Sequence, residues 1–144
     1  MRTWHGPGGD RGTVSLYVVM FAPIVLMLAG LLVDGGLAIH ARQRAADVAE
    51  QAARAGANQI DEAALRRTGD PVLDTGRARS AACALVRRYD SEAVPVSCTA
   101  TTDRVDVTVR LTVRSQILGI IPGLGQFTMT SAATAHPVTG EGAP

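Results

Sequence analysis

The feature that most constrains this chain is an uncharged apolar run near its start, "VSLYVVMFAPIVLMLAGLLV", residues 14–33. As a helix, a run of 20 residues is about 30 Å long, which matches the hydrocarbon core of a bilayer. The run is apolar on all sides, whereas the core helix of a soluble protein has a polar and an apolar face. Residues 14–33 are therefore predicted to form a membrane-spanning helix.

A cleaved secretion signal is the main alternative for this run. The apolar part of such a signal is usually about 7–15 residues long and precedes a small-x-small cleavage site. This run is longer, and its end, "LLVDGG", offers no such site. Pro23 and Gly30 would weaken a soluble helix but are tolerated in a membrane span. The pattern favours a retained span over an exported domain released from a signal.

The orientation of the span is predicted from two opposing signals. Arginines are more frequent after the span than before it, which alone favours a cytoplasmic C-terminal part. However, the N-terminal flank is only about a dozen residues long and contains Gly-Pro-Gly-Gly, too little to fold by itself. Cys83 and Cys98 are the only cysteines, and their spacing suits a disulfide in an oxidising compartment, with two separate buried thiols as the alternative. We expect the N-terminus in the cytoplasm and the C-terminal domain outside.

An Ala-rich helix is predicted to continue from the span as far as Gly56. Along it, Asp34 with Gly35-Gly36 is either a hinge or an interfacial charge without a further role. A seam of small residues follows at heptad spacing. It is either the core face of the domain or a packing surface for partner subunits. The seam consists of Ala38, Ala41, Ala45, Val48, Ala52 and Ala55.

The remaining chain is predicted to form helices and then strands. Residues 62–67 form a short helical turn, and Asp74 caps a second helix that runs to Tyr89. Apolar and polar residues alternate over 94–100 and 105–113, which predicts a hairpin with one buried face. Residues 127–135 alternate again and form a third strand. The apolar connection "ILGIIPGLG", residues 117–125, either lies on the membrane surface or covers the core as a lid.

The sequence contains no pattern that predicts chemistry. The formal net charge is +1, so a nucleic-acid partner is not expected. All 14 basic residues are Arg, which excludes a P-loop lysine and a Schiff-base lysine. The three histidines are scattered without metal-ligand spacing. We therefore predict a protein that is not an enzyme, with no catalytic residues, no metal and no cofactor.

Four motifs between residues 11 and 56 resemble the TadE/TadG-like Flp (tight adherence) pilus-assembly proteins. A short leader ends in Arg-Gly, Pro23 lies in mid-span, "GL-x-V-D-x-G" closes the span at Gly30 to Gly36, and "AAD-x-A" follows from Ala45. The later part resembles the short actinobacterial members more loosely. The resemblance implies a bitopic membrane protein of a pilus or secretion apparatus. Its partners would be the lipid bilayer and other membrane proteins of that apparatus, in an oligomeric state that stays open.

The resemblance also raises the question of leader cleavage. Pilin-like relatives are cut after a Gly and carry Glu at the fifth mature position, which corresponds here to Tyr17. We therefore expect an uncleaved, TadG-like accessory protein. A pilin-like subunit cleaved between Gly12 and Thr13 is one alternative, and a membrane-tethered extracytoplasmic binding module unrelated to pili is another.

The expected fold is α+β with a pilin-like architecture. A single N-terminal transmembrane helix extends into a long helix, and a second helix and a small antiparallel sheet follow. The predicted segments are a short flank or leader (1–13), the transmembrane helix (14–33), the extended Ala-rich helix (34–60), a small extracytoplasmic α+β domain (61–136) and a disordered tail (137–144).

Overall fold

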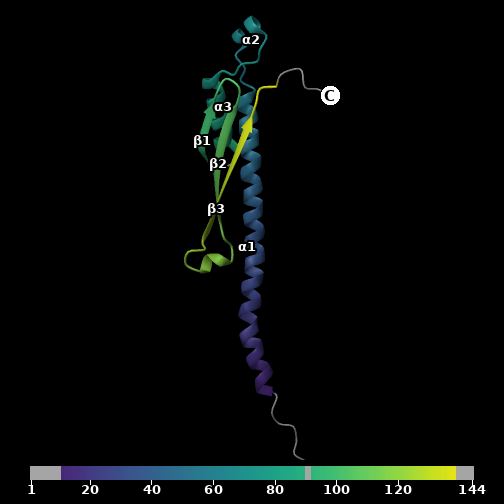
Figure 1. Cartoon of the computed structure of the whole chain (residues 1–144). Helices are drawn as coiled ribbons and strands as arrows, with labels where there is room; N and C mark the ends of the chain where they lie inside the picture. Colours follow the sequence, from purple (N-terminus) through teal and green to yellow (C-terminus); the bar gives the residue numbers. More distant parts are fainter. Residues whose placement is uncertain (1–10, 90–91, 139–144) are drawn as a thin grey trace, which may run out of the picture.

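A computed structural model describes residues 11–89 and 92–138 of the chain. The three strands pair antiparallel in the order β1-β2-β3, so the fold is α+β, as predicted (Figure 1). Residues 1–10 of the predicted leader and residues 139–144 of the predicted tail lie outside the described residues. The elements are α1 (Arg11–Ala57), α2 (Glu62–Thr68), α3 (Thr75–Tyr89), β1 (Ala93–Ala100), β2 (Val105–Arg114), the 3₁₀ helix η1 (Leu118–Ile120) and β3 (Gln126–Ala135).

Helix α1 is a single uninterrupted helix of 47 residues, which corresponds to about 70 Å. Its C-terminal half lies alongside the sheet, whereas its N-terminal half projects beyond it (Figure 1). The helix continues through Gly35 and Gly36, so the interpretation of this point as a hinge is wrong. A helix tolerates two glycines when neighbouring turns keep their hydrogen bonds, at a modest cost in stability.

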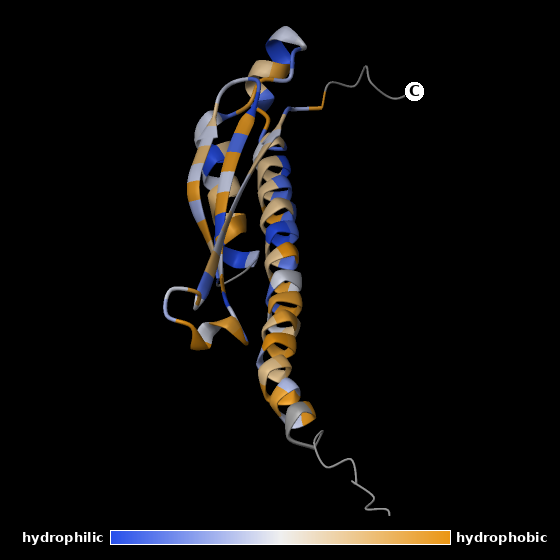
Figure 2. Cartoon of the chain, turned by 60° about the horizontal axis from the view of Figure 1, so that its bottom comes forward, coloured by the Kyte–Doolittle hydropathy of each residue, from blue (hydrophilic) through white to orange (hydrophobic). Residues whose placement is uncertain are grey.

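The projecting half of α1 is apolar around its whole circumference (Figure 2). All side chains from Val14 to Ala29 are exposed. Among the described residues, α1 is the one helix that is long and apolar enough to cross a membrane. An apolar helix surface of this extent needs an apolar solvent or apolar partners to cover it.

The core lies between the C-terminal half of α1, helix α3 and one face of the sheet. On β2, Val105, Val107, Val109 and Leu111 point inward and are fully buried, as the alternation predicted. On β1 the prediction is wrong at Val94 and Val96, which are exposed, because the strand register shifts between Pro95 and Ser97. Helix α3 adds small side chains to the same cluster. The core side chains of the two helices are Ala41, Ala45, Val48, Ala49, Ala52, Ala53, Ala57, Ala78, Ala82 and Val86.

The predicted seam on α1 belongs to this core face. Four of its members, Ala41, Ala45, Val48 and Ala52, are buried, and the remaining two, Ala38 and Ala55, are half-buried. The sheet and α3 cover the four buried members of the seam, so these four side chains belong to the core of the domain. Small side chains at these positions let the helix backbone approach the sheet closely.

Two aspartates define the starts of the shorter helices. Asp61 Oδ1 accepts hydrogen bonds from the backbone N–H groups of Ala63 and Ala64 at the start of α2. Asp74 Oδ1 accepts one from the N–H of Arg77 at the start of α3, as the sequence predicted. Each aspartate pairs N–H groups that the helix itself leaves without a partner.

The two cysteines lie on neighbouring elements of the domain. The Sγ atoms of Cys83 on α3 and Cys98 on β1 are 2.06 Å apart, and their Cα atoms are 6.0 Å apart. A bond between them would tie α3 to the edge strand β1. In the chain-entropy model a cross-link over a loop of this size stabilises the fold by about 3 kcal/mol.

The first prediction concerns Gly56, where α1, α3 and β2 meet most closely. A Cβ atom at Gly56 would lie 2.9 Å from the carbonyl oxygen of Ala78 and 2.9 Å from Val105 Cγ1. Gly56→Ala is therefore expected to lower the free energy of unfolding by about 1–3 kcal/mol through overpacking. Hydrogen exchange of the buried β2 amides in the detergent-solubilised protein measures this change.

Gly36→Ala is the matched control on the same helix. No atom lies within 4 Å of the Cβ position at Gly36. This substitution should stabilise α1 by about 0.5–1 kcal/mol, because alanine favours the helix more than glycine does. Equal effects of the two substitutions would contradict the close packing at Gly56.

Candidate functional site

The candidate site is the junction between the projecting half of α1 and the sheet domain. After β2 the chain forms the β2–β3 loop, defined here as residues 115–125, which contains η1. This loop reaches down along α1 to the level at which the helix leaves the sheet (Figure 1). The junction therefore decides how the apolar half of α1 is held relative to the domain.

Asp34 of α1 binds the β2–β3 loop directly. Its side chain is fully buried, and it is the one buried charged or polar residue among those that the structure describes. Asp34 Oδ1 accepts a hydrogen bond from the N–H of Gln116 at 2.8 Å, and Oδ2 accepts hydrogen bonds from Ile117 at 3.1 Å and Leu118 at 2.6 Å. Hydrogen bonds to a charged acceptor are about twice as strong as those between neutral groups.

Gly30 lies one helical turn before Asp34 and makes room for the same loop. A Cβ atom at Gly30 would lie 2.7 Å from Ile117 Cγ2 and 3.3 Å from Ile117 Cβ. Since a β-branched side chain cannot swing away at its Cβ atom, only glycine permits this contact. Gly30 and Asp34 thus both contact the loop. Gly30 leaves space for Ile117, and the carboxylate of Asp34 binds the loop backbone.

The β2–β3 loop is also closed by its own hydrogen bonds. The N–H of Ile121 donates to the carbonyl of Leu118 at 2.9 Å, and the N–H of Leu124 donates to that of Ile121 at 3.1 Å. At its base, the N–H of Ser115 donates to the carbonyl of Gly125 at 3.2 Å. The Ser115 hydroxyl donates to the carbonyl of Leu124. The loop therefore has a defined shape of its own.

An apolar groove runs between this loop and α1 on the side of the projecting half. All the side chains that line the groove are aliphatic or methionine. The wall on α1 consists of Ile24, Met27, Leu28 and Leu31, and the wall on the loop consists of Leu118, Ile121 and Leu124.

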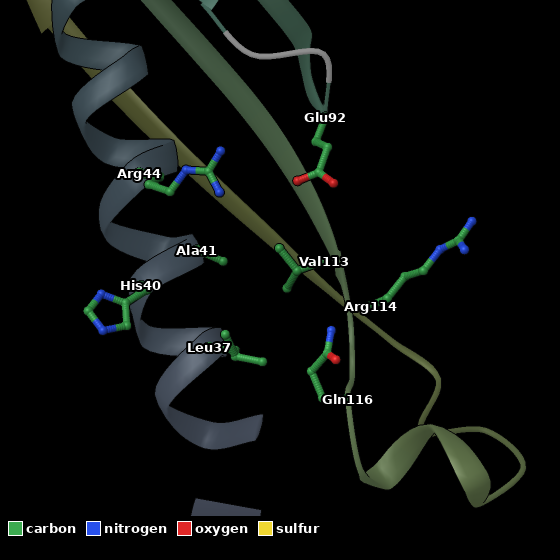
Figure 3. Close-up of a pocket in the computed structure, with 8 residues that line it drawn as sticks. All are labelled: Leu37, His40, Ala41, Arg44, Glu92, Val113, Arg114 and Gln116. Atoms are coloured by element: carbon green, nitrogen blue, oxygen red, sulfur yellow. The ribbon is translucent and has the colours of Figure 1, made fainter. Parts of the chain in front are cut away.

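A second, polar pocket lies on the domain side of the junction (Figure 3). Its lining residues are Leu37, His40, Ala41, Arg44, Glu92, Val113, Arg114 and Gln116. Figure 3 shows the guanidinium of Arg44 and the carboxylate of Glu92 pointing toward each other, whereas the imidazole of His40 faces away from Arg114, which points outward.

The structure places the predicted site residues in separate regions. Gly12 and Thr13 lie in the first turn of α1, at the far end from the junction. The cysteine pair lies on α3 and β1, also away from it. Over the residues that the structure describes, no group of three or more His, Cys, Asp or Glu side chains could hold a metal ion.

Asp34 is the functional residue that the sequence interpretation missed. The hypothesis that it is an interfacial charge with no further role is wrong, since it binds three backbone N–H groups. Two sequence signals were available: a single carboxylate directly after the apolar run, and the lack of any charged residue from Ser115 to Ala135. Neither signal alone indicates that the two segments meet.

We predict that Asp34→Ala releases the β2–β3 loop from α1. Hydrogen bonds to charged groups contribute about 1.5–3 kcal/mol each, so the amides of Gln116, Ile117 and Leu118 should exchange their hydrogens at least about tenfold faster. Hydrogen exchange of the full-length protein in detergent, resolved by residue, measures this change. Amides in the middle of β2 should keep their exchange rates.

Two further variants make this test specific. Asp34→Asn keeps one carbonyl oxygen as acceptor, so its effect should be intermediate. Glu50→Ala removes an exposed carboxylate that pairs with Arg54 on the same helix, and exposed pairs of this kind contribute little. Unchanged exchange at residues 116–118 in Asp34→Ala would show that the carboxylate does not hold the loop.

Comparison with known families gives one match, which covers about a third of the chain. Residues 12–59 match the Tad family, whose description is "Putative Flp pilus-assembly TadE/G-like". No curated protein and no solved structure is significantly similar to the chain. The matched residues coincide almost completely with α1 and include Gly30 and Asp34. Residues 12–59 are therefore similar to the TadE/TadG-like Tad family, which confirms the resemblance inferred from the sequence motifs.

Proposed function

We propose that the protein is a single-pass membrane component of Flp/Tad-type pilus assembly, or of a related surface or secretion apparatus, and that it is not an enzyme. The observation that carries this proposal is the Tad match over residues 12–59, because it falls on the helix that is long and apolar enough to cross a membrane. The description of the matched family names pilus assembly. The junction at Asp34 and Gly30 explains why two polar or small residues end an otherwise apolar run.

The proposal includes an orientation and a division of the chain. Residues 14–33 span the cell membrane, the N-terminus faces the cytoplasm, and the domain of residues 61–136 lies outside. The proximity of Cys83 and Cys98 supports an oxidising location for the domain. Residues 34–60 carry the helix from the lipid into the core of that domain.

The proposed role is to hold a small domain at a fixed distance and angle above the membrane. An unbroken helix transmits force and position from the span to the sheet, because it contains no joint. Partner proteins of the apparatus can meet the span within the lipid or the exposed face of the sheet. No contact in the structure selects one of these two surfaces, so the partners are proposed by class alone.

The function is tested in the organism that carries the gene. Deletion of the gene is expected to abolish surface pili and adherence, and the wild-type gene should restore both. A variant with Val19→Arg and Leu26→Arg should fail to restore them, because a charged side chain in the middle of a span costs about 2.5–3.5 kcal/mol on insertion scales. Electron microscopy with pilus counts is the measurement.

The control places the same charges on the domain. Val94 and Val138 are exposed to 56% and 82%, comparable with the 67% and 70% exposed at Val19 and Leu26. Val94→Arg with Val138→Arg should restore pili, because both side chains already face water. A deletion strain that keeps normal pili would overturn the proposed function.

The proposed function also leads to a prediction about the two thiols and the N-terminus. We expect intact mass spectrometry of the membrane-extracted, denatured protein to show no thiol adduct after alkylation alone and two adducts after reduction. Adducts without reductant would contradict the disulfide between Cys83 and Cys98. The same mass spectrum shows whether the N-terminal leader has been removed. The uncleaved chain is expected, and a product that begins at Thr13 would favour the pilin-like subunit instead.

A further inference from the structure

We propose that the β2–β3 loop is a second membrane contact, and that the apolar groove between this loop and α1 takes the acyl chains of lipids in the leaflet on the domain's side. The inference rests on the proposed span in α1. It goes beyond a single-pass anchor, because it makes a segment far along the chain part of the membrane-embedded surface.

The depth of the loop follows from its contacts with α1. The hydrogen bonds of Asp34 fix residues 116–118 at the end of the apolar run. From there the groove extends along α1 to Ile24, which precedes Asp34 by ten residues, or about 15 Å along the helix axis. This is about half of a hydrocarbon core that is about 30 Å thick. A span at residues 14–33 therefore places the tip of the loop within the lipid.

The side chains of the loop suit that depth. Ile120 at the tip is 86% exposed, and Ile117 and Leu124 are 40% and 41% exposed. No residue from Ser115 to Ala135 carries a charge. Large apolar side chains gathered on one exposed tip mark a surface that is covered by lipid or by a partner. Arg114 immediately precedes the loop and is exposed, and the long side chain of an arginine beside an apolar surface can extend toward lipid headgroups.

Most backbone N–H groups of the loop are paired within the protein, which lowers the cost of placing the loop in lipid. Irregular backbone at membrane depth is tolerated only where its polar groups are paired within the protein. The N–H groups of residues 116–118 donate to Asp34, and those of Ser115, Ile121 and Leu124 donate to carbonyls of the loop. Pro122 has no N–H to pair. The Asp34 carboxylate itself is fully buried beneath these donors and so is shielded from the hydrocarbon.

Lipid is the occupant that the structure favours. One wall of the groove is the span itself, whose surrounding solvent is acyl chains wherever no protein covers it. The groove is lined by apolar side chains alone, so it offers no hydrogen bond that would select a peptide. A second copy of this chain is the competing occupant, and the experiment below separates the two.

The test uses quenching of tryptophan by brominated acyl chains. The full-length protein with Trp4→Phe, which removes the only native tryptophan, is reconstituted at low protein-to-lipid ratio into vesicles of phosphatidylcholine brominated in mid-chain. Ile120→Trp in this background is expected to lose emission to a degree comparable with Leu26→Trp in the span. Leu124→Trp gives a second reading from the same loop.

Val138→Trp is the matched control, because Val138 is 82% exposed but follows β3 at the far end of the sheet from the loop. It should not be quenched. If Leu26→Trp is quenched while Ile120→Trp and Leu124→Trp behave like Val138→Trp, the loop proposal is overturned and the span stands. If Leu26→Trp is not quenched either, the membrane span of the proposed function fails as well. Quenching at Ile120→Trp that disappears as the protein-to-lipid ratio rises would assign the groove to a second copy and overturn the lipid proposal.

Discussion

The structure depends on one buried carboxylate. Asp34 is fully buried at the point where an apolar helix surface meets a packed domain, and a buried charge is very costly unless it is paired and hydrogen-bonded. Three consecutive backbone N–H groups of the β2–β3 loop satisfy it. The same three groups would lack partners without the carboxylate, because a short 3₁₀ turn leaves its first N–H groups unpaired. The carboxylate of Asp34 and the N–H groups of residues 116–118 therefore each need the other as a hydrogen-bond partner.

This junction determines how rigidly the span and the domain are connected. Helix α1 passes without a break from the apolar half into the core, where small side chains bring it close to β2 and α3. The loop adds a second connection from the end of β2 back to α1. With two connections, the sheet cannot rotate about the helix without breaking either the core packing or the Asp34 hydrogen bonds. We infer that tilting of the span within a membrane would be transmitted to the sheet.

Local patterns in the sequence predicted most of the fold. The alternation of Val105, Val107 and Val109 with polar residues has a period of two, and it places these valines on one buried face whatever lies opposite them. The cap at Asp74 acts within three residues, so its role is readable from the nearby sequence. The length of the apolar run can likewise be counted directly in the sequence, without knowledge of any tertiary contact. The buried face of β2, the cap at Asp74 and the long apolar helix were therefore accessible without a structure.

The junction was not accessible in the same way. Asp34 and Gln116 are separated by 82 positions in the sequence, and the donors are backbone groups that any residue other than proline supplies. No residue type at positions 116–118 indicates that an acceptor is near. The two interpretations of the connection at 117–125, a membrane contact or a lid on the core, also depended on where the loop lies relative to α1. That position is set by tertiary packing and not by local pattern.

The spacing within the motif "GL-x-V-D-x-G" now has a physical reason. Gly30 and Asp34 are four positions apart, so they lie on the same face of α1, and both contact the β2–β3 loop. Gly36 has no atom near its Cβ position, so packing does not require a glycine there. The motif lies within the matched residues 12–59, whereas the donors to Asp34 lie at 116–118, outside the match. The Tad-like segment of this chain therefore contacts a loop from the chain's own C-terminal part. Without that loop, the carboxylate of Asp34 would lose its three backbone donors.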